Sequence, residues 1–154
     1  MAMEGIMARL GIFIGSVYGG AEDLAEALAE SAGAIDTQVY FDPTLDDFLD
    51  YKDDNVLIIS STTGQGEIPE NLLPLYVALQ DQFPLLPQQQ FGVIALGDSS
   101  YGEDRFCGAG RQFDALLVEL GAKPVQYRLD IDAGVHFEPL DVAQGWFNTF
   151  IAQI

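Results

Sequence analysis

Short apolar runs alternate with stretches of helical periodicity along the chain. Segments 10–14, 56–59 and 91–96 are dominated by aliphatic and aromatic residues, and serine or glycine follows the last two runs. Runs that are apolar on both faces are typical of central strands in a parallel sheet covered on both sides. Two weaker segments, 37–41 and 125–129, are predicted to be flanking strands.

Between these runs, apolar residues recur three and four positions apart, which predicts amphipathic helices. Gly33 and Gly121 follow two of these patterns, and glycine commonly ends a helix. We also expect a short helix within residues 42–51. The periodic positions are Leu24, Ala25, Leu28 and Ala32; Leu72, Leu75, Tyr76 and Leu79; Phe113, Leu116, Leu117 and Leu120; and Val142, Trp146, Phe150 and Ile154.

Five strands alternating with helices predict an α/β fold of three layers, in which helices cover both faces of a doubly wound parallel sheet. Right-handed crossovers limit the arrangement, and the order 2-1-3-4-5 is the natural choice for five strands. Ligands bind such sheets beyond the carboxyl ends of the strands. We therefore expect the functional residues just after Ile14, Ile59 and Leu96.

The composition is that of one folded domain with a strong acidic excess. The chain has 154 residues, 49% of them hydrophobic, and it carries 6 Lys and Arg against 24 Asp and Glu, a formal net charge of -18. This balance argues against binding nucleic acids or anionic membranes, both of which require clustered basic residues. It favours basic macromolecular partners, with solubility alone as the competing explanation.

The cysteine, the histidine and the terminal residues further limit the kinds of protein that the chain can be. Cys107 is the single cysteine, which excludes an intrachain disulfide and suits the reducing cytoplasm. His136 is the single histidine and no cluster has zinc-ligand spacing, so we expect no metal. We expect no signal peptide and no membrane span. Residues 1–154 are taken as a single domain, with about 1–8 a frayed or vector-derived stretch.

The first candidate loop, residues 15–21, joins a predicted strand to a predicted helix. Its glycines allow close approach of the backbone, and helix-start amides with the hydroxyls of Ser16 and Tyr18 suit a phosphate. It contains no lysine or arginine, so neutral donors would hold that phosphate. The alternative is a tight turn whose helix is stabilised by its own acids, Glu22 and Asp23.

The second and third candidate loops also follow predicted strands. Residues 60–67 are mostly small, hydroxylated or glycine, which suits a flat polar ligand; an ordinary polar loop is the alternative. The third loop reads Gly97-Asp98-Ser99-Ser100-Tyr101 and then Phe106-Cys107-Gly108. Its Tyr101 stands at the open end of the sheet, where it would stack on a ring or pack on its own loop. For Cys107 we favour a small, partly buried residue at a helix start, because no neighbouring base is evident.

With these three loops in order, the chain resembles the short-chain flavodoxins, in particular the small MioC-like bacterial members. It is also similar to the FMN domain of diflavin reductases. The resemblance covers nearly the whole chain, and it implies the flavodoxin-like fold and one non-covalent FMN. The motifs that carry it are Gly15-Ser16-Val17-Tyr18-Gly19-Gly20-Ala21, Ser61-Thr62-Thr63-Gly64-Gln65-Gly66-Glu67 and Leu96-Gly97-Asp98-Ser99-Ser100-Tyr101 with Phe106-Cys107.

The resemblance implies a role for each loop. The first loop would wrap the FMN phosphate, the second would line one edge and the inner face of the isoalloxazine ring, and the third would cover the pyrimidine edge and the outer face, with Tyr101 stacked. Phe106 and Cys107 would pack near the third loop, and Asp132 would lie near the site. The implied FMN-binding residues are Ser16, Val17, Tyr18, Gly19, Gly20, Ala21, Thr62, Thr63, Gly64, Gln65, Gly66, Gly97, Asp98, Tyr101, Phe106, Cys107 and Asp132.

Three departures from the family pattern stand within these loops. Ala21 occupies a position where the phosphate loop often has threonine, which removes one hydroxyl donor. Thr63 stands where many flavodoxins place an aromatic residue on the inner face of the ring. Residues 102–105 make the third loop about two residues longer than the related pattern.

The function implied is electron carriage by a cytoplasmic, monomeric flavoprotein with no catalytic residues of its own. A flavodoxin/ferredoxin–NADP reductase would supply the electrons and an acceptor enzyme would take them. An FMN-binding regulatory or assembly module is the main alternative. An ester hydrolase is disfavoured because Gly97-Asp98-Ser99 follows the wrong strand and His136 is poorly spaced from Asp132. A phospho-receiver domain would need an aspartate at the Ser60 and Ser61 positions, and a lysine where Asp130 stands.

Overall fold

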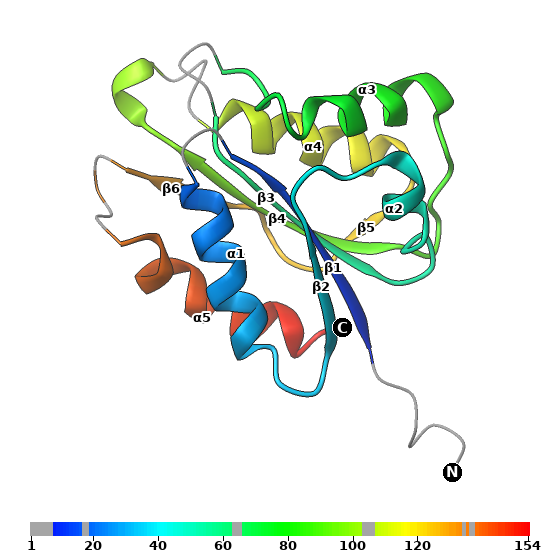
Figure 1. The fold of residues 1–154 in the computed structure, drawn as a ribbon, viewed down its shortest axis with the longest axis horizontal. Helices are drawn as coiled ribbons and strands as arrows, with labels where there is room; N and C mark the ends of the chain where they lie inside the picture. The colour runs from blue at the N-terminus through cyan, green and yellow to red at the C-terminus, as the bar shows by residue number, and fades with distance from the viewer. Residues whose placement is uncertain (1–7, 17–18, 63–65, 103–106, 134, 136–137) are drawn as a thin grey trace.

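A parallel sheet with helices on both faces forms the molecule (Figure 1). The computed structural model describes residues 8–16, 19–62, 66–102, 107–133, 135 and 138–154. The strands are β1 (Arg9–Gly15), β2 (Asp36–Tyr40), β3 (Asn55–Ser60), β4 (Gln90–Gly97), β5 (Lys123–Pro124) and β6 (Leu129–Asp132). The helices are α1 (Gly20–Ser31), α2 (Leu45–Leu49), α3 (Leu73–Gln82), the 3₁₀ turn η2 (Ser99–Tyr101), α4 (Gly108–Glu119) and α5 (Pro139–Ile151).

The strand order is β2-β1-β3-β4-β5, with β6 also paired to β4, and every pairing is parallel. The expected order 2-1-3-4-5 and the three-layer α/β class are therefore confirmed. The predicted helices, including the short one within residues 42–51, are present as well. The final helix ends at Ile151, so Ile154 lies beyond it.

The prediction of one strand over residues 125–129 is wrong. β5 pairs Pro124 with Phe91, whereas β6 pairs Leu129 with Ile94. Only two residues of β4, 92 and 93, thus lie opposite the four residues 125–128. The two extra residues have no partner in β4, so the chain bulges away from the sheet there. The indole N–H of Trp146 donates to the Tyr127 carbonyl oxygen (2.8 Å) and holds this detour against α5.

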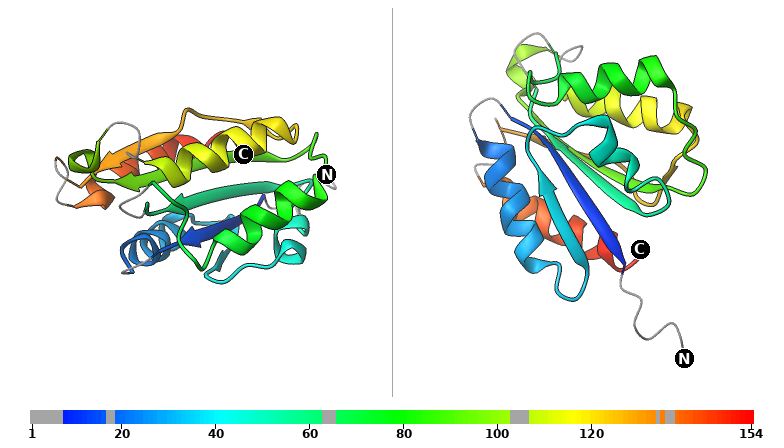
Figure 2. Two further views of the ribbon diagram at one scale, coloured as in Figure 1. Left: turned by 90° about the horizontal axis from the view of Figure 1, so that it is seen from above. Right: turned by 45° about the vertical axis from the view of Figure 1, so that its right-hand side comes forward.

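Alternate residues of the central strands enter two separate cores, as strands covered on both sides require. Ile12 of β1 packs beneath α1 and α5, while the adjacent Phe13 packs beneath α2, α3 and α4. Figure 2 shows the two helical layers on opposite sides of the twisted sheet. A one-residue slip of a central strand would move every side chain to the opposite face and hence into the other core. Because both faces are buried, the register is strongly specified.

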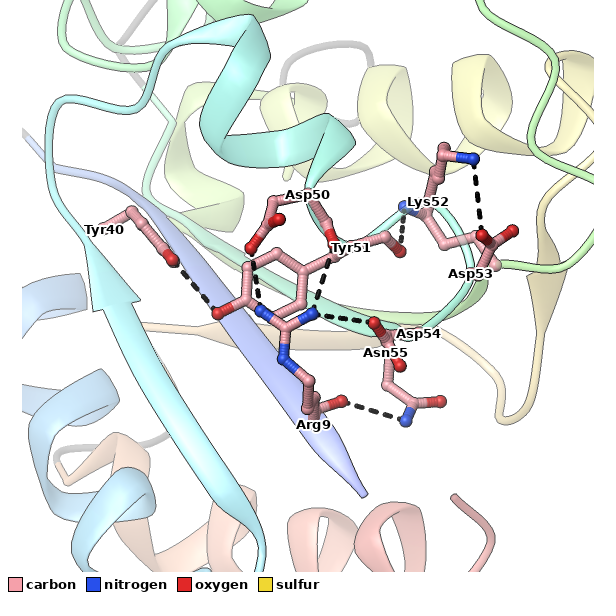
Figure 3. A network of polar contacts seen from close by, with 9 residues as sticks. Arg9, Tyr40, Asp50, Tyr51, Lys52, Asp53, Asp54 and Asn55 are labelled. Atoms are coloured by element: carbon pink, nitrogen blue, oxygen red, sulfur yellow. Dashed lines mark hydrogen bonds and ion pairs between the residues drawn. The ribbon is translucent and has the colours of Figure 1, made fainter. Parts of the chain in front are cut away.

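A polar network closes the amino-terminal edge of the sheet (Figure 3). The Arg9 guanidinium lies over the Tyr51 ring, 4.5 Å from its centroid, and pairs with Asp50 (2.8 Å) and Asp54 (2.9 Å). The Asp50 hydrogen bond raises the pKa of Arg9, and burial raises the pKa of Tyr51, whose hydroxyl meets that of Tyr40 at 3.0 Å. These groups satisfy one another, and Arg9 and Asp54 place most of the network at the amino ends of β1 and β3.

Among the residues that the structure describes, no helix has both the length and the apolar character needed to cross a membrane.

Gly110 lets α4 lie directly on β4, which leads to a stability prediction. A Cβ built at Gly110 overlaps the Ala95 methyl and lies 3.1 Å from the Ala95 Cα, whereas one built at Gly145 on α5 has no neighbour within 4 Å in the part of the chain that the structure describes. Gly110→Ala should lower the free energy of unfolding by about 1–3 kcal/mol, because α4 must move off the sheet. Gly145→Ala should leave it unchanged or raise it by up to about 1 kcal/mol through helix propensity. Urea unfolding followed by circular dichroism measures both, and equal effects would contradict the close approach.

Candidate functional site

The loops after β1, β3 and β4 begin side by side at one edge of the sheet. Gly15, the last residue of β1, pairs with Ser60 of β3, and Ser60 pairs with Ala95 of β4. β4 continues for two residues to Gly97, which pairs with Asp132 at the end of β6. The three loops proposed from the sequence are thus neighbours in space, as expected, and Asp132 joins them.

The first loop turns tightly into α1. The Ser16 hydroxyl oxygen accepts a hydrogen bond from the Gly19 N–H (2.8 Å), and Gly19 has a φ of 86°, which favours glycine. A Cβ built at Gly19 or Gly20 meets no atom of the described residues within 4 Å, which leaves room there for a ligand to approach the backbone. The first amides of α1 have no acceptor within the helix and can bind an anion. Val17 and Tyr18 lie outside the described residues.

Ala21 differs from its neighbours because its side chain belongs to the core. It is fully buried within the apolar layer under α1. Any contact that it makes with a ligand would therefore come from its backbone amide. Glu22 and Asp23 stand in the first turn of α1, where they interact favourably with the helix dipole and repel an anion.

Asn71 is a polar residue of this edge that the sequence analysis missed. Its side-chain oxygen accepts a hydrogen bond from the Ser16 N–H (3.0 Å), and its amide nitrogen donates to the carbonyl oxygens of Ile14 (2.7 Å) and Phe41. Asn71 just before an apolar helix suggests an N-cap, but the cap position is Leu72. No pattern in the sequence around Asn71 indicates that its side chain hydrogen-bonds to the end of β1.

The second loop is attached to α4 at both of its described ends. The Thr62 hydroxyl oxygen accepts a hydrogen bond from the Ala109 N–H (3.3 Å), and the Gln112 side chain donates to the Gly66 carbonyl oxygen (3.0 Å). Gly66 also lies against Gly108, where an added Cβ would be 2.5 Å from the Gly66 oxygen. Thr63, Gly64 and Gln65 lie outside the described residues, between these two attachments.

The third loop forms the turn η2, which two carboxylates stabilise. Asp98 is the N-cap and accepts a hydrogen bond from the Ser100 N–H (2.9 Å), while Asp132 accepts one from the Ser99 N–H (3.1 Å). Asp132 therefore contacts the loop, in keeping with the expectation that it lies near the site. The backbone of Tyr101 ends the turn; its side chain and Phe106 lie outside what is described.

Cys107 packs against the start of the third loop, at Gly97. It is the N-cap of α4 in the left-handed conformation (φ 53°), and a Cβ built at Gly97 would lie 2.7 Å from the Cys107 nitrogen. Its thiol lies 3.4 Å from the Ala95 carbonyl oxygen and is fully buried, rather than partly buried as expected. Burial, reinforced by the charge of Asp130, raises the pKa of the thiol to about 12. Cys107 thus packs near the loop as an inert thiol.

The described basic residues lie outside the three loops. The described residues of the three loops include no lysine or arginine, so a phosphate would be bound there by neutral donors. Among described basic residues, Arg9 begins β1, Lys123 begins β5, and Lys52 precedes β3, toward the amino-terminal edge, whereas Arg111 stands in the first turn of α4, close to Cys107. Arg128 is paired with Asp114 and Asp130, each 2.8–2.9 Å away.

The described part of the chain gives no support to the other chemistries considered. It contains no group of three or more His, Cys, Asp or Glu side chains that could hold a metal ion. His136, which an esterase would need as a base, lies outside the described residues. At the receiver-domain positions, Ser60 ends β3, Ser61 follows it, and Asp130 pairs with Arg128.

Comparisons with known proteins point to one family. A protein-family profile described as Flavodoxin matches residues 12–144. Flavodoxin YqcA of Pectobacterium carotovorum subsp. carotovorum is 46% identical over 147 residues, covering 94% of this chain and 95% of that protein. Protein MioC of Escherichia coli K12 is 40% identical over 147 residues, covering 94% and 97%.

A solved structure agrees with these sequence matches. A cysteine-to-alanine mutant of a flavodoxin from Pseudomonas aeruginosa superposes with a TM-score of 0.86 at 39% sequence identity, covering 94% of this chain and 97% of that one. The fold and the family resemblance inferred from the three loops are both supported by these findings.

The burial of Cys107 predicts that its thiol is unreactive in the folded protein. With a pKa near 12, the thiolate fraction at pH 8 is far smaller than that of an exposed cysteine, for which the value is 9.0. A disulfide reagent such as DTNB should react at least about 100-fold more slowly with native protein at pH 8 than with protein unfolded in guanidinium. Because the chain has one cysteine, the absorbance change reports this residue alone. Native and unfolded rates within tenfold of each other would contradict the placement.

Proposed function

This chain belongs to the flavodoxin family, and we propose that it holds one FMN non-covalently across the three loops and carries electrons between other proteins. One observation carries the proposal: the register of β1, β3 and β4 brings the three flavodoxin-like loops together at one edge of the sheet. We also propose that it acts as a cytoplasmic monomer, that residues 1–154 form a single FMN domain, and that it is a carrier rather than an enzyme.

The first loop and the start of α1 would hold the FMN phosphate. The Ser16 and Gly19 N–H groups are used within the protein, so the described donors would be the Ser16 hydroxyl hydrogen and the first amides of α1, those of Gly20 and Ala21, with Val17 and Tyr18 completing the loop. Glu22 and Asp23 oppose a dianion, so hydrogen bonds from neutral donors must outweigh their repulsion. These donors would suit a single phosphate group bound at a helix N-terminus.

The second and third loops would enclose the isoalloxazine ring. Residues Thr62 to Gly66 would line its inner face and one edge, with the loop ends fixed on α4. Gly97, Asp98 and Tyr101 would cover the other face, with Phe106 and Cys107 packed behind them and Asp132 holding the turn. The Gly64 peptide would turn with the redox state, so that its carbonyl oxygen could accept a hydrogen bond from the N5–H that the ring carries only after reduction, because glycine accommodates either orientation of that peptide without a Cβ clash.

FMN, when bound, supplies the redox chemistry, and the protein tunes it. Reduced FMN is anionic, so each nearby carboxylate disfavours reduction. Glu67, Glu70 and Asp98 belong to or flank the described loops, and Glu103 and Asp104 lie in the third loop outside the described residues. At about 10 Å in a water-like dielectric one charge contributes about 0.4 kcal/mol, so several together should lower the potential noticeably.

The partners would be basic redox proteins, a flavodoxin/ferredoxin–NADP reductase and an acceptor enzyme. The net charge of -18 favours such partners, and the basic residues that begin β1 and β5 lie toward the opposite edge. Glu67 and Glu70 lie near the edge where the ring would be exposed, so attraction of a basic partner to these acids would serve electron transfer.

The cofactor itself provides the first test. Purified protein should be yellow, and heat release followed by chromatography should yield FMN and no FAD, because the first loop offers one monophosphate site. Reconstitution of the apoprotein with each flavin checks the same preference. FAD, or an apoprotein that binds neither flavin, would contradict the proposal, whereas bound FMN that no reductase can reduce would favour a regulatory or assembly module.

The location of the docking face provides a second test. Reduction by a basic reductase should slow as salt is added, since exposed charges are screened over about 8 Å at physiological ionic strength. Glu67→Gln combined with Glu70→Gln should flatten this dependence, because both residues flank the loops that enclose the ring. Stopped-flow measurement of the association rate against ionic strength gives the slope.

The matched control removes the same charge elsewhere. Glu26→Gln combined with Glu30→Gln alters exposed residues farther along α1, and it should change the slope much less. Equal slopes for the two double variants would place the docking face away from the three loops.

A further inference from the structure

We propose that Asn71 is a positioning residue that fixes the first loop for the FMN phosphate, an inference that rests on the proposed function. Asn71 follows the second loop in sequence, yet its side chain bonds to the backbone on both sides of Gly15. The Ser16 N–H donates to Oδ1 (3.0 Å), and Nδ2 donates to the Ile14 carbonyl oxygen (2.7 Å) and to that of Phe41.

All three bonds are directed at backbone, and they join segments far apart in the chain. Asn71 lies 55 residues from Ser16, 57 from Ile14 and 30 from Phe41. An amide side chain has two N–H donors and one carbonyl oxygen, so both donors and one acceptor site are used. No other residue type presents donors and acceptor in this geometry, and an aspartate of the same shape would place an oxygen against two carbonyl oxygens.

Packing at Gly15 reinforces this arrangement. A Cβ built at Gly15 would lie 2.5 Å from the Ser60 hydroxyl oxygen and 3.0 Å from a methyl of Leu72. Leu72 is fully buried against this glycine, while Asn71 bonds to the residues on either side of it. Two consecutive residues of one segment thus determine where the backbone of β1 ends and the first loop begins.

The position of Ser16 in turn determines what the loop can offer a phosphate. Its N–H is engaged by Asn71 and its hydroxyl oxygen accepts from Gly19, which orients the hydroxyl hydrogen away from Gly19 and sets the start of α1. The described ends of the second loop are held by α4, and the third by Asp98 and Asp132. Asn71 should therefore affect phosphate binding far more than ring binding.

The experiment compares FMN with riboflavin, which has the same ring and no phosphate. Dissociation constants are measured by flavin fluorescence quenching on the apoprotein of the wild type and of Asn71→Ala. We expect FMN affinity to fall on the order of tenfold, as loss of positioning hydrogen bonds entails, and riboflavin affinity to stay within about twofold. Asn71→Asp keeps the acceptor for Ser16 but adds a negative charge, so it should weaken FMN further and still spare riboflavin.

Asn55→Ala is the matched control. Asn55 also donates from its side chain to a β1 carbonyl oxygen, that of Arg9 at 3.0 Å, but at the opposite end of the strand. Its loss should lower thermal stability without changing the ratio of FMN to riboflavin affinity. If Asn71→Ala and Asn71→Asp leave the ratio of FMN to riboflavin affinity unchanged, whether or not both affinities fall, the role of Asn71 is overturned while FMN binding stands. Failure of the wild-type apoprotein to bind FMN would instead overturn the proposed function, and this inference with it.

Discussion

Parallel pairing of β1, β3 and β4 in a single register is the constraint on which the rest of the structure depends. Each of these strands is buried on both faces, so Ile12 and Phe13 must enter opposite cores and a slipped register would misplace both. The same register places Gly15, Ser60 and Ala95 in line. Burial of the core therefore decides where the three loops start, and the candidate site follows from hydrophobic packing.

Close approach of small residues then brings α4 into the site. Gly110 allows the helix to lie on Ala95, and Gly97 allows the backbone of β4 to pass over Cys107. The first turns of α4 consequently hydrogen-bond to the described ends of the second loop, and Cys107 at the start of α4 packs against the third loop. A cysteine in this position acts as a small buried side chain, because burial keeps its thiol protonated.

Charged groups have different partners at the two edges of the sheet. At the amino-terminal edge, Arg9 is satisfied by Asp50 and Asp54, so its charge contributes to the structure. At the carboxyl-terminal edge, the described loop residues include no cation, and acids flank the loops. A phosphate bound there depends on oriented neutral donors, which makes their exact placement important and gives a residue such as Asn71 its significance.

The sequence by itself determined the class, the order of elements and the three loops, because apolar periodicity reports which faces of each segment are buried. It also predicted the helix ends at Gly33 and Gly121, where φ is positive. Only the tertiary structure decided that two short strands, 123–124 and 129–132, stand in place of the predicted strand 125–129, since the surplus of residues between them appears only when both are aligned with β4. The contacts of Asn71 were equally invisible, because a side-chain amide that bonds backbone 55 residues away leaves no periodic trace in its own segment. Local pattern encodes burial, whereas hydrogen bonds between distant segments depend on register and packing that exist only in the folded chain.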